Sequence, residues 1–234
     1  MRIAVGLDVD GTIDQVLERA HQLHGLGFRN FWSSQIFGPD TLTTIAIVGR
    51  ELRDSNFGTA VVPIQPRHPS MLGAQARTVQ AAIGGQLSLG IGLSHQVVVE
   101  GMWGMSFDKP ATYMKEYVAA LAPILRGEAV NAQGERIKAV TMGPIGPVTD
   151  RRPDLILAAL GPVMLDLAGR EADGTCLWMT GVNTIKNHVA PLINQAASAA
   201  GKPAPRVVAS LPIVVTDDVA RVREEINSIL AIYG

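Results

Sequence analysis

The feature that most constrains the fold of this chain is a regular alternation of short apolar runs with segments of helical periodicity. Seven apolar runs are predicted to be strands, and most are separated by stretches with apolar residues at helical spacing. The predicted strands are residues 3–9, 28–34, 57–64, 87–92, 155–160, 174–179 and 207–216. Such apolar strands are typical of a parallel sheet whose outer face is covered by helices. The sequence therefore predicts one α/β domain over residues 1–234.

Helix-start signals support this alternation. Thr12 is followed three residues later by Gln15, which is the pattern of a capping box. Asp40 is expected to cap a second helix, and Pro69 suits the first turn of a third. Each of these helices lies between two predicted strands, as the crossovers of a parallel sheet require.

Two arrangements of such a sheet are possible: an open doubly wound sheet and a (β/α)8 TIM barrel. The Gly-x-Gly-x-x-Gly fingerprint is absent from the first strand-to-helix turn, and Gly90-x-Gly92 is too short a match. The alternation breaks over residues 93–152 and then resumes. Seven units predict a barrel with an insertion at 93–152 and without its eighth βα unit. Because an open apolar edge is a liability, we expect the natural chain to continue beyond Gly234.

Composition and charge exclude several classes of function. Lys and Arg number 20 against 21 Asp and Glu, so no nucleic-acid surface is expected. The longest stretch without these residues, 78–99, has too many glycines and polar side chains to cross a membrane, and the N-terminus lacks a signal-peptide pattern. The single cysteine, Cys176, excludes an internal disulfide and a cysteine-based zinc site and fits a reducing cytoplasm. No metal, membrane or nucleic-acid partner is predicted.

One short motif suggests a hydrolytic chemistry. Residues 8–12 are Asp-Val-Asp-Gly-Thr, which resembles the opening motif of haloacid-dehalogenase-type phosphatases. In that family Asp8 would be the nucleophile and Asp10 the general acid or base. The chemistry also needs a lysine and a late acidic pair for Mg²⁺, and the late acids Asp217 and Asp218 lack the expected preceding glycine. The alternative is a structural turn in which Thr12 caps the following helix.

A longer pattern of short motifs extends over most of the chain, in a fixed order along the predicted strands. The motifs are Gly-Thr-Ala-Val (58–61), Arg-His-Pro (67–69), Gly-Gly-Gln-Leu-Ser-Leu-Gly-Ile-Gly (84–92), Ala-Ala-Leu-Gly-Pro (158–162), Ala-Asp-Gly (172–174) and Met-Thr-Gly (179–181). Their order and spacing resemble the luciferase-like monooxygenase family. Within it, the resemblance is strongest to the oxidoreductases that use the deazaflavin coenzyme F420.

The resemblance implies a (β/α)8 barrel of the bacterial-luciferase type with an insertion after the fourth strand, in agreement with the break at 93–152. The cofactor would lie at the carboxyl ends of the strands. Deazaflavin enzymes of the family commonly have a non-prolyl cis peptide bond in the third strand, as a bulge behind the ring. Here that bond would join Ala60 and Val61, which are therefore candidate cofactor-binding residues. The resemblance also implies a homodimer.

The family's cofactor phosphate lies near the start of the helix after the fifth strand. Glycine there allows close approach, proline suits the first helical turn, and the free N–H groups of a helix start attract an anion. The segment after the sixth strand is expected to add a hydroxyl and a backbone N–H, although a Gly-Pro helix start also occurs without a ligand. The candidate cofactor-binding residues of these two segments are Leu160, Gly161, Pro162, Met179, Thr180 and Gly181.

Catalytic candidates are few. Several deazaflavin enzymes carry an Asp-His pair at the end of the second strand, where this chain has Gln35 and Ile36. A proton-transferring histidine is therefore absent there, which disfavours the alcohol- and sugar-oxidising subfamilies, and Gln35 is a catalytic candidate by position. Ser94 and His95 follow the fourth strand, and both are candidate cofactor-binding residues. His95 is expected either to bind the cofactor or deliver a proton at this face, or to act only as a structural cap.

Other aromatic residues and histidines are weaker candidates for the functional site. Trp103, in the insertion, is a candidate for an apolar substrate pocket, and Trp178 fits the core as well as a site. His68 is expected to be structural. His188 is expected to lie at the surface or the rim.

These observations predict an oxidoreductase that transfers a hydride between coenzyme F420 and a small organic substrate, with the cofactor carrying the redox chemistry. An FMN-dependent monooxygenase on the same fold is the first alternative, because fold alone does not separate the two. A phosphatase using Asp8 and Asp10 and a barrel fragment without activity are the others.

Overall fold

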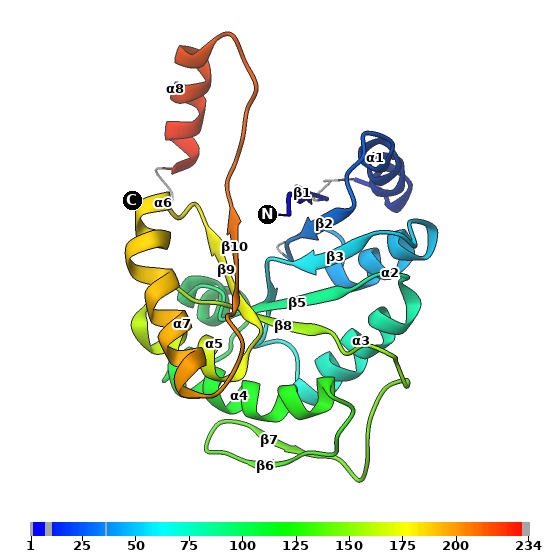
Figure 1. The fold of residues 1–234 in the computed structure, drawn as a ribbon, viewed down its shortest axis with the longest axis vertical. Coiled ribbons are helices and arrows are strands. Elements are labelled where there is room, and N and C mark those ends of the chain that lie inside the picture. Colours follow the sequence, from blue (N-terminus) through cyan, green and yellow to red (C-terminus); the bar gives the residue numbers. More distant parts are fainter. Residues whose placement is uncertain (1, 8–10, 36, 231–234) are drawn as a thin grey trace.

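A computed structural model describes residues 2–7, 11–35 and 37–230 of the chain, with a parallel sheet at its centre (Figure 1). The strands of this sheet are β1 (Val5–Gly6), β2 (Asn30–Ser33), β3 (Asn56–Thr59), β4 (Val62–Pro63), β5 (Leu87–Gly92), β8 (Asp154–Ala158), β9 (Gly174–Trp178) and β10 (Arg206–Ser210). The helices are α1 (Ile13–Gly25), α2 (Thr41–Glu51), α3 (Pro69–Ala82), α4 (Pro110–Leu125), α5 (Pro162–Glu171), α6 (Val182–Thr184), α7 (Ala190–Ala199) and α8 (Val219–Leu230). Within the described residues, no helix has the length and apolar character needed to cross a membrane.

The strands of the sheet lie side by side in chain order. β1, β2, β3, β5, β8, β9 and β10 are successive hydrogen-bonded neighbours, all parallel, and β4 continues β3 along β5. A doubly wound sheet would instead have its first strand in the interior. The predicted barrel-type arrangement and its seven strands are therefore confirmed. Among the described residues β1 and β10 do not pair with each other, so the sheet is curled but not closed (Figure 1).

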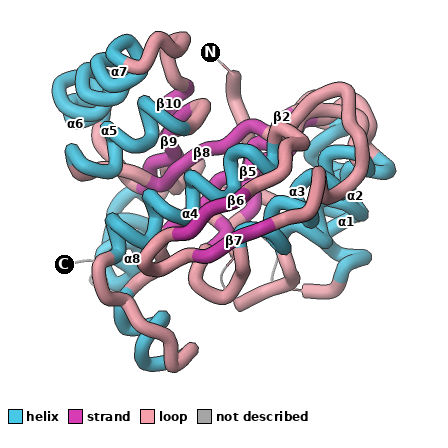
Figure 2. The backbone as a smooth tube through the Cα atoms, turned by 90° about the horizontal axis from the view of Figure 1, so that it is seen from below, coloured by secondary structure: helices cyan, strands magenta, loops and turns pink. Residues whose placement is uncertain are grey.

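The break in the alternation corresponds to an insertion between β5 and β8. It contains a π-helical turn η1 (Val97–Met102), helix α4, and an antiparallel hairpin of β6 (Asn131–Gln133) and β7 (Lys138–Val140). The hairpin lies beside α4 and outside the parallel sheet (Figure 2). The insertion therefore adds to the outer layer and leaves the strand order unchanged.

The last strand is shorter than the sequence predicts. β10 ends at Ser210, whereas the apolar pattern continues to residue 216. Its neighbour β9 ends at Trp178, because Met179 takes a φ of 48° and leaves strand geometry. Residues beyond Ser210 then have no strand to pair with among the described residues, and Ile213 is exposed. An apolar alternation alone does not distinguish a paired strand from an extended segment without a partner.

The predicted helix starts are confirmed by their hydrogen bonds. Thr12 N–H donates to Gln15 Oε1 (2.8 Å) and Gln15 N–H donates to Thr12 Oγ1 (3.3 Å), which completes the capping box of α1. Asp40 Oδ1 accepts from Thr43 N–H at the start of α2, and Pro69 is the first residue of α3. These caps satisfy N–H groups that a helix leaves unpaired.

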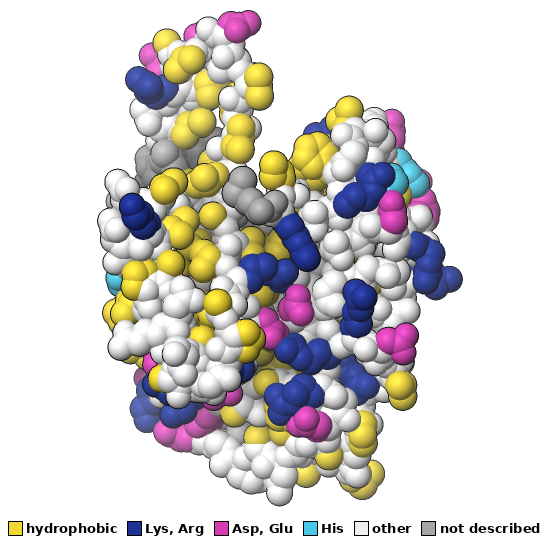
Figure 3. Space-filling view, viewed as in Figure 1, with side chains coloured by type: hydrophobic (Ala, Val, Ile, Leu, Met, Phe, Trp, Pro, Cys, Tyr) yellow, Lys and Arg dark blue, Asp and Glu magenta, His cyan; other side chains and the backbone are white. Residues whose placement is uncertain are grey.

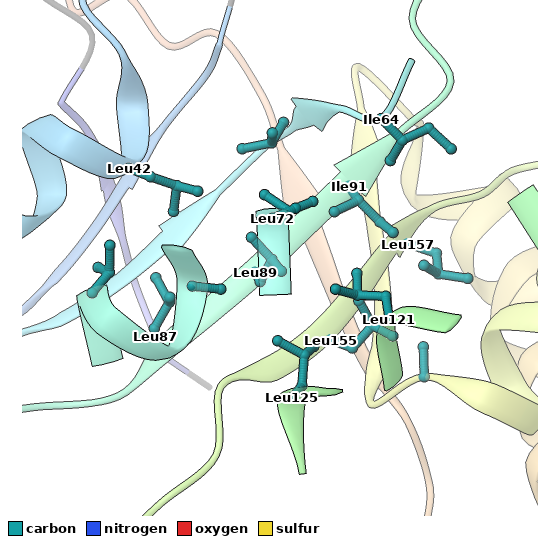
Figure 4. Close-up of a cluster of buried hydrophobic side chains, with 14 of the residues drawn as sticks. Leu42, Ile64, Leu72, Leu87, Leu89, Ile91, Leu121, Leu125, Leu155 and Leu157 are labelled. Atoms are coloured by element: carbon teal, nitrogen blue, oxygen red, sulfur yellow. The ribbon is translucent and has the colours of Figure 1, made fainter. Parts of the chain in front are cut away.

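The hydrophobic core lies between the sheet and the helices (Figure 4). Leu89 and Ile91 of β5 and Leu155 of β8 are buried there, beside leucines of α3 and α4. Because side chains alternate along a strand, Gly90 and Gly92 face the inside of the curl. On β5, large residues thus face the helices, and the two glycines face the interior near the carboxyl end of the strand.

Candidate functional site

The predicted site residues all follow the carboxyl ends of strands. Parallel strands of one sheet end at the same edge, so these segments share the edge at which barrel enzymes bind their ligands. They are Gln35 after β2, Ala60 and Val61 between β3 and β4, Ser94 and His95 after β5, Leu160, Gly161 and Pro162 after β8, and Met179, Thr180 and Gly181 after β9.

The sheet has a bulge between β3 and β4. Gly58 pairs with Ser88 of β5 but Val62 pairs with Ile91, so the β3–β4 side has one residue more than β5 over this interval. The Ala60–Val61 peptide bond inside the bulge is cis, as the resemblance predicts. That Ala60 and Val61 contact a cofactor stays a prediction.

Thr59 and Gly90 connect the bulge to β5. The Thr59 hydroxyl accepts from Gly90 N–H and donates to the Gly90 carbonyl, both at 2.8 Å. A Cβ on Gly90 would lie 1.8 Å from the Thr59 carbonyl oxygen, and a Cβ on Gly92 would lie 2.6 Å from Val61 Cγ2. The strands can approach this closely because both positions lack a side chain.

Gln35 connects the loop after β2 to this bulge. Its N–H donates to the Val61 carbonyl (3.2 Å), and its Oε1 accepts from Thr41 N–H at the start of α2 (2.8 Å). The structure therefore brings Gln35 and Val61 together and gives Gln35 a helix-capping contact. Its catalytic role stays a prediction.

An ion pair further fixes this part of the edge. Arg67 Nη2, in the loop after β4, lies 2.6 Å from Asp40 Oδ2. Burial alone would raise the pKa of the Asp40 carboxyl, but hydrogen bonds from Thr43 and the Arg67 guanidinium hold that pKa below its usual value. The buried Tyr117 hydroxyl donates to the Arg67 carbonyl at 2.8 Å. The loops after β2 and β4 are thus joined to each other and to α4.

Ser94 and His95 form the turn that leaves β5. Ser94 has a φ of 59°, in the left-handed region, and the His95 carbonyl accepts from Val98 and Val99 at the start of η1, both at 2.9 Å. The His95 side chain is exposed. The role of His95 in proton transfer stays a prediction.

The carboxyl edge of the sheet after β8 and β9 differs from the part near the bulge. Helix α5 begins after Gly161 and α6 after Gly181, and neither start has a side-chain cap. A Cβ on either glycine would have no atom within 4 Å, and Pro162 occupies the first turn of α5. The N–H groups of two neighbouring helix starts are therefore accessible to an anion.

A cavity of about 240 Å³ adjoins these helix starts. Its lining is mostly apolar, and hydrophobic side chains also gather on this face around α6 and the end of β10 (Figure 3). Trp178, which the sequence leaves between core and site, is 54% exposed here. The lining residues are Ala158, Ala159, Leu160, Cys176, Leu177, Trp178 and Thr180.

Two histidines have roles that their contacts define. His68 is structural as predicted: its Nδ1 accepts from Ser70 N–H at the start of α3, and its Nε2 lies 2.9 Å from the Lys138 carbonyl oxygen. His188, expected at the surface or rim, has its Nε2 2.9 Å from the Leu160 carbonyl oxygen. Sequence reasoning gave His188 no part in the site, because no motif connects residues 28 apart in the chain.

Asp8 and Asp10, the residues of the phosphatase hypothesis, lie outside the described residues. The described residues form a singly wound, curled parallel α/β sheet of the barrel type, whose candidate ligand-binding groups lie at its carboxyl edge. The sequence model of the luciferase-like monooxygenase family matches residues 1–234. The chain belongs to that family, and because the match includes residues 8–12 it gives the phosphatase hypothesis no support.

Three known proteins are similar to this chain. A 5,10-methylenetetrahydromethanopterin reductase of Methanolobus tindarius is 29% identical over an alignment of 171 positions that covers 70% of this chain and 51% of the relative. A protein of Mycobacterium tuberculosis, assigned by name to the coenzyme F420-dependent oxidoreductases, is 27% identical over an alignment of 232 positions that covers 88% of this chain and 64% of the relative. The chain thus spans about half to two thirds of the length of these relatives.

The third is a solved structure, the oxygenating constituent of 3,6-diketocamphane monooxygenase of Pseudomonas putida in complex with FMN. It has a TM-score of 0.78 and 17% identity, and the match covers 100% of this chain and 74% of that one. At this identity the likeness concerns the fold.

Proposed function

We propose that this chain binds the phosphate-bearing deazaflavin coenzyme F420 at the carboxyl edge of its sheet, and that the whole protein transfers a hydride between that cofactor and a small organic substrate. The observation that carries the proposal is the pair of uncapped helix starts at Gly161 and Gly181 beside an apolar cavity. Backbone N–H groups suit a phosphate, and an apolar cavity suits an aromatic ring. The relative assigned to coenzyme F420 supports this choice of cofactor.

The groups present fit such a cofactor. The N–H groups at the start of α5 and the Thr180–Gly181 segment would hold its phosphate, with Leu160 and Met179 in contact beside them. Ala60 and Val61 would lie behind the ring at the bulge. When bound, the deazaflavin supplies the carbon that accepts or gives up the hydride.

The chain's own residues would bind, orient and exclude water. Leu160 and Trp178 are apolar side chains at the cavity and would cover the reacting face from solvent. The exposed imidazole of His95, next to Ser94, would hold or deliver a proton to the substrate. Gln35 would keep the loop after β2 against the bulge through its contacts with Val61 and α2.

A flavin monooxygenase is the second candidate. A solved structure of the same fold holds FMN, so the fold is compatible with that cofactor. FMN also combines a phosphate with an aromatic tricyclic ring, so the same donors and the same cavity would serve. The two candidates differ in the reaction of the reduced ring, with oxygen or with an organic substrate.

An aspartate at residue 161 tests the phosphate site. Aspartate is a good helix cap, so Gly161→Asp is expected to raise the free energy of unfolding by about 0.3 kcal/mol. Its carboxylate would occupy the N–H groups and place a negative charge where the phosphate binds. Binding of F420 and FMN is therefore expected to weaken by about tenfold or more, measured by fluorescence titration of the full-length protein.

Two controls separate charge from capping and phosphate from ring. Gly161→Asn caps the helix without a charge and is expected to weaken binding less. Riboflavin, and the deazaflavin without its phosphate, are expected to bind the Gly161→Asp variant as they bind the original protein. An equal loss for phosphate-free rings, or no loss for F420 and FMN, would contradict the proposal.

A further inference from the structure

His188 occupies an unusual position in the helix after β9. Residues 182–199 are helical throughout, but η2 (Ile185–Val189) within them is a π-helical turn. Such turns are rare, and they occur frequently at functional sites because the wider turn changes the direction of its side chains. His188 lies in this turn and, half-buried, contacts the loop after β8.

The contact of His188 has a defined direction. A carbonyl oxygen only accepts hydrogen bonds, so His188 Nε2 donates to the Leu160 carbonyl oxygen at 2.9 Å. Among the described residues, His188 is the only donor to this carbonyl. The preceding carbonyl, of Ala159, accepts from the Thr175 hydroxyl of β9 at 3.1 Å. Two side chains from two different elements therefore fix the short loop between β8 and α5.

The geometry of the peptide group connects this contact to the helix start. The Leu160 carbonyl and the Gly161 N–H belong to one planar trans peptide, in which they point in opposite directions. Fixing the carbonyl toward His188 therefore fixes the Gly161 N–H away from it. The start of α5 has no side-chain cap of its own to hold this peptide.

We propose that His188 is a positioning residue for the phosphate of the bound cofactor: it orients the Leu160–Gly161 peptide so that the start of α5 is ready to receive an anion. This inference rests on the proposed function. It gives the π-helical turn a specific purpose, which is to direct an imidazole from the helix after β9 to the loop after β8. His188 itself does not touch the cofactor.

Three variants of the full-length chain test the role of His188. His188→Ala removes the donor, His188→Gln offers an amide N–H from a side chain of similar reach, and His21→Ala is the matched control. His21 is also a histidine bonded to another element, with its Nε2 2.6 Å from Glu51 Oε2, but it lies on α1. The probes are F420 and the same deazaflavin without its phosphate, with dissociation constants measured by fluorescence titration.

His188→Ala is expected to raise the dissociation constant of F420 about threefold to tenfold and to leave that of the phosphate-free deazaflavin unchanged. His188→Gln is expected to restore part of the loss, and His21→Ala to change neither constant. Hydrogen exchange of the unliganded protein is expected to become faster over residues 159–165 in His188→Ala, which reports the loop without any cofactor.

The outcomes distinguish this inference from the proposed function. If the original protein prefers F420 to the phosphate-free ring and His188→Ala keeps that preference, the role of His188 is wrong and the phosphate site stands. An equal loss for both probes would also reject it, since a general structural defect has no preference for phosphate. If the original protein binds neither probe, both proposals fail.

Discussion

The carboxyl edge of the sheet has two sides that are built in different ways. On the bulge side, formed by residues 34–35, 37–41, 58–67 and 90–95, backbone and side chains are joined by close hydrogen bonds. Two glycines there let neighbouring strands approach to van der Waals contact. On the helix side, formed by residues 158–163 and 176–182, two helix starts are uncapped and Trp178 is exposed. The first side is held together by hydrogen bonds among its own residues, although the buried Gln65 Oε1 has no hydrogen-bond partner among the described residues. The second side leaves helix-start N–H groups and apolar surface exposed. Under the proposed function, the first side would position the ligand and the second would bind it.

The largest expected effect comes from adding a methyl group on the bulge side. Gly90→Ala would place its Cβ 1.8 Å from the backbone oxygen of Thr59, which cannot move without shifting the strand. The free energy of unfolding is expected to fall by about 3 kcal/mol or more. Chemical denaturation measures this loss.

The matched substitution on the helix side is Gly161→Ala. No atom lies within 4 Å of the added Cβ, so the expected loss is at most about 1 kcal/mol, from the poorer helix cap. Similar losses at residues 90 and 161 would show that the two sides do not differ in packing.

A smaller effect is expected from the hydroxyl that bridges β3 and β5. Thr59→Val removes both 2.8 Å hydrogen bonds and leaves the Gly90 N–H and carbonyl buried without that partner. The expected loss is about 1–3 kcal/mol. Thr180→Val, on the helix side, removes one longer bond to the Trp178 carbonyl (3.3 Å) and is expected to cost less. The comparison fails if Thr180→Val is the more destabilising of the two in the same denaturation experiment.

The contrast between the sides also explains how much the sequence could predict. The strands and their order follow from apolar runs and helical spacing, and the Thr12–Gln15 capping box is a local signal. The family resemblance predicts the cis peptide bond between Ala60 and Val61, and no local sequence propensity indicates that bond.

Contacts between distant elements were not predictable in this way. The hydrogen bond from His188 to Leu160 depends on a π-helical turn and on the packing of α7 against α5, and neither has a sequence pattern that is recognisable in a single chain. The end of β10 at Ser210 likewise depends on its neighbour, because β9 supplies no partner after Trp178. The apolar residues after Ser210 are compatible with a strand, but they form none because no neighbouring strand pairs with them among the described residues.

The pH dependence of stability provides a third comparison. Because the pKa of Asp40 is lowered in the folded protein, its contribution to stability is present above about pH 4, the unfolded value, and is lost as pH falls through the folded pKa. Asp40→Asn keeps a good helix cap but removes the charge that pairs with Arg67. At pH 7 the variant is expected to be about 0.5–1 kcal/mol less stable, since the pair is partly exposed to solvent.

Denaturation of both proteins between pH 7 and pH 2.5 checks this sign. The difference in the free energy of unfolding between the original protein and Asp40→Asn is expected to become smaller below about pH 4, where Asp40 in the unfolded original protein becomes protonated. A difference that stays constant down to pH 2.5 would mean that Asp40 acts on the bulge side through its shape and hydrogen bonds alone.

The last comparison concerns how deep the exposed surface of the helix side reaches into the fold. Cys176 lines the cavity below Trp178, but it is only 6% exposed, and burial raises the pKa of its thiol to about 12. Since the thiolate is the reactive form, a disulfide reagent at pH 8 is expected to modify Cys176 about 100-fold more slowly than free cysteine, or slower still. Rapid modification of the folded protein would show that the helix side opens down to the sheet. Slow modification, together with binding of the cofactor, would limit the open surface to the helix starts and the exposed indole.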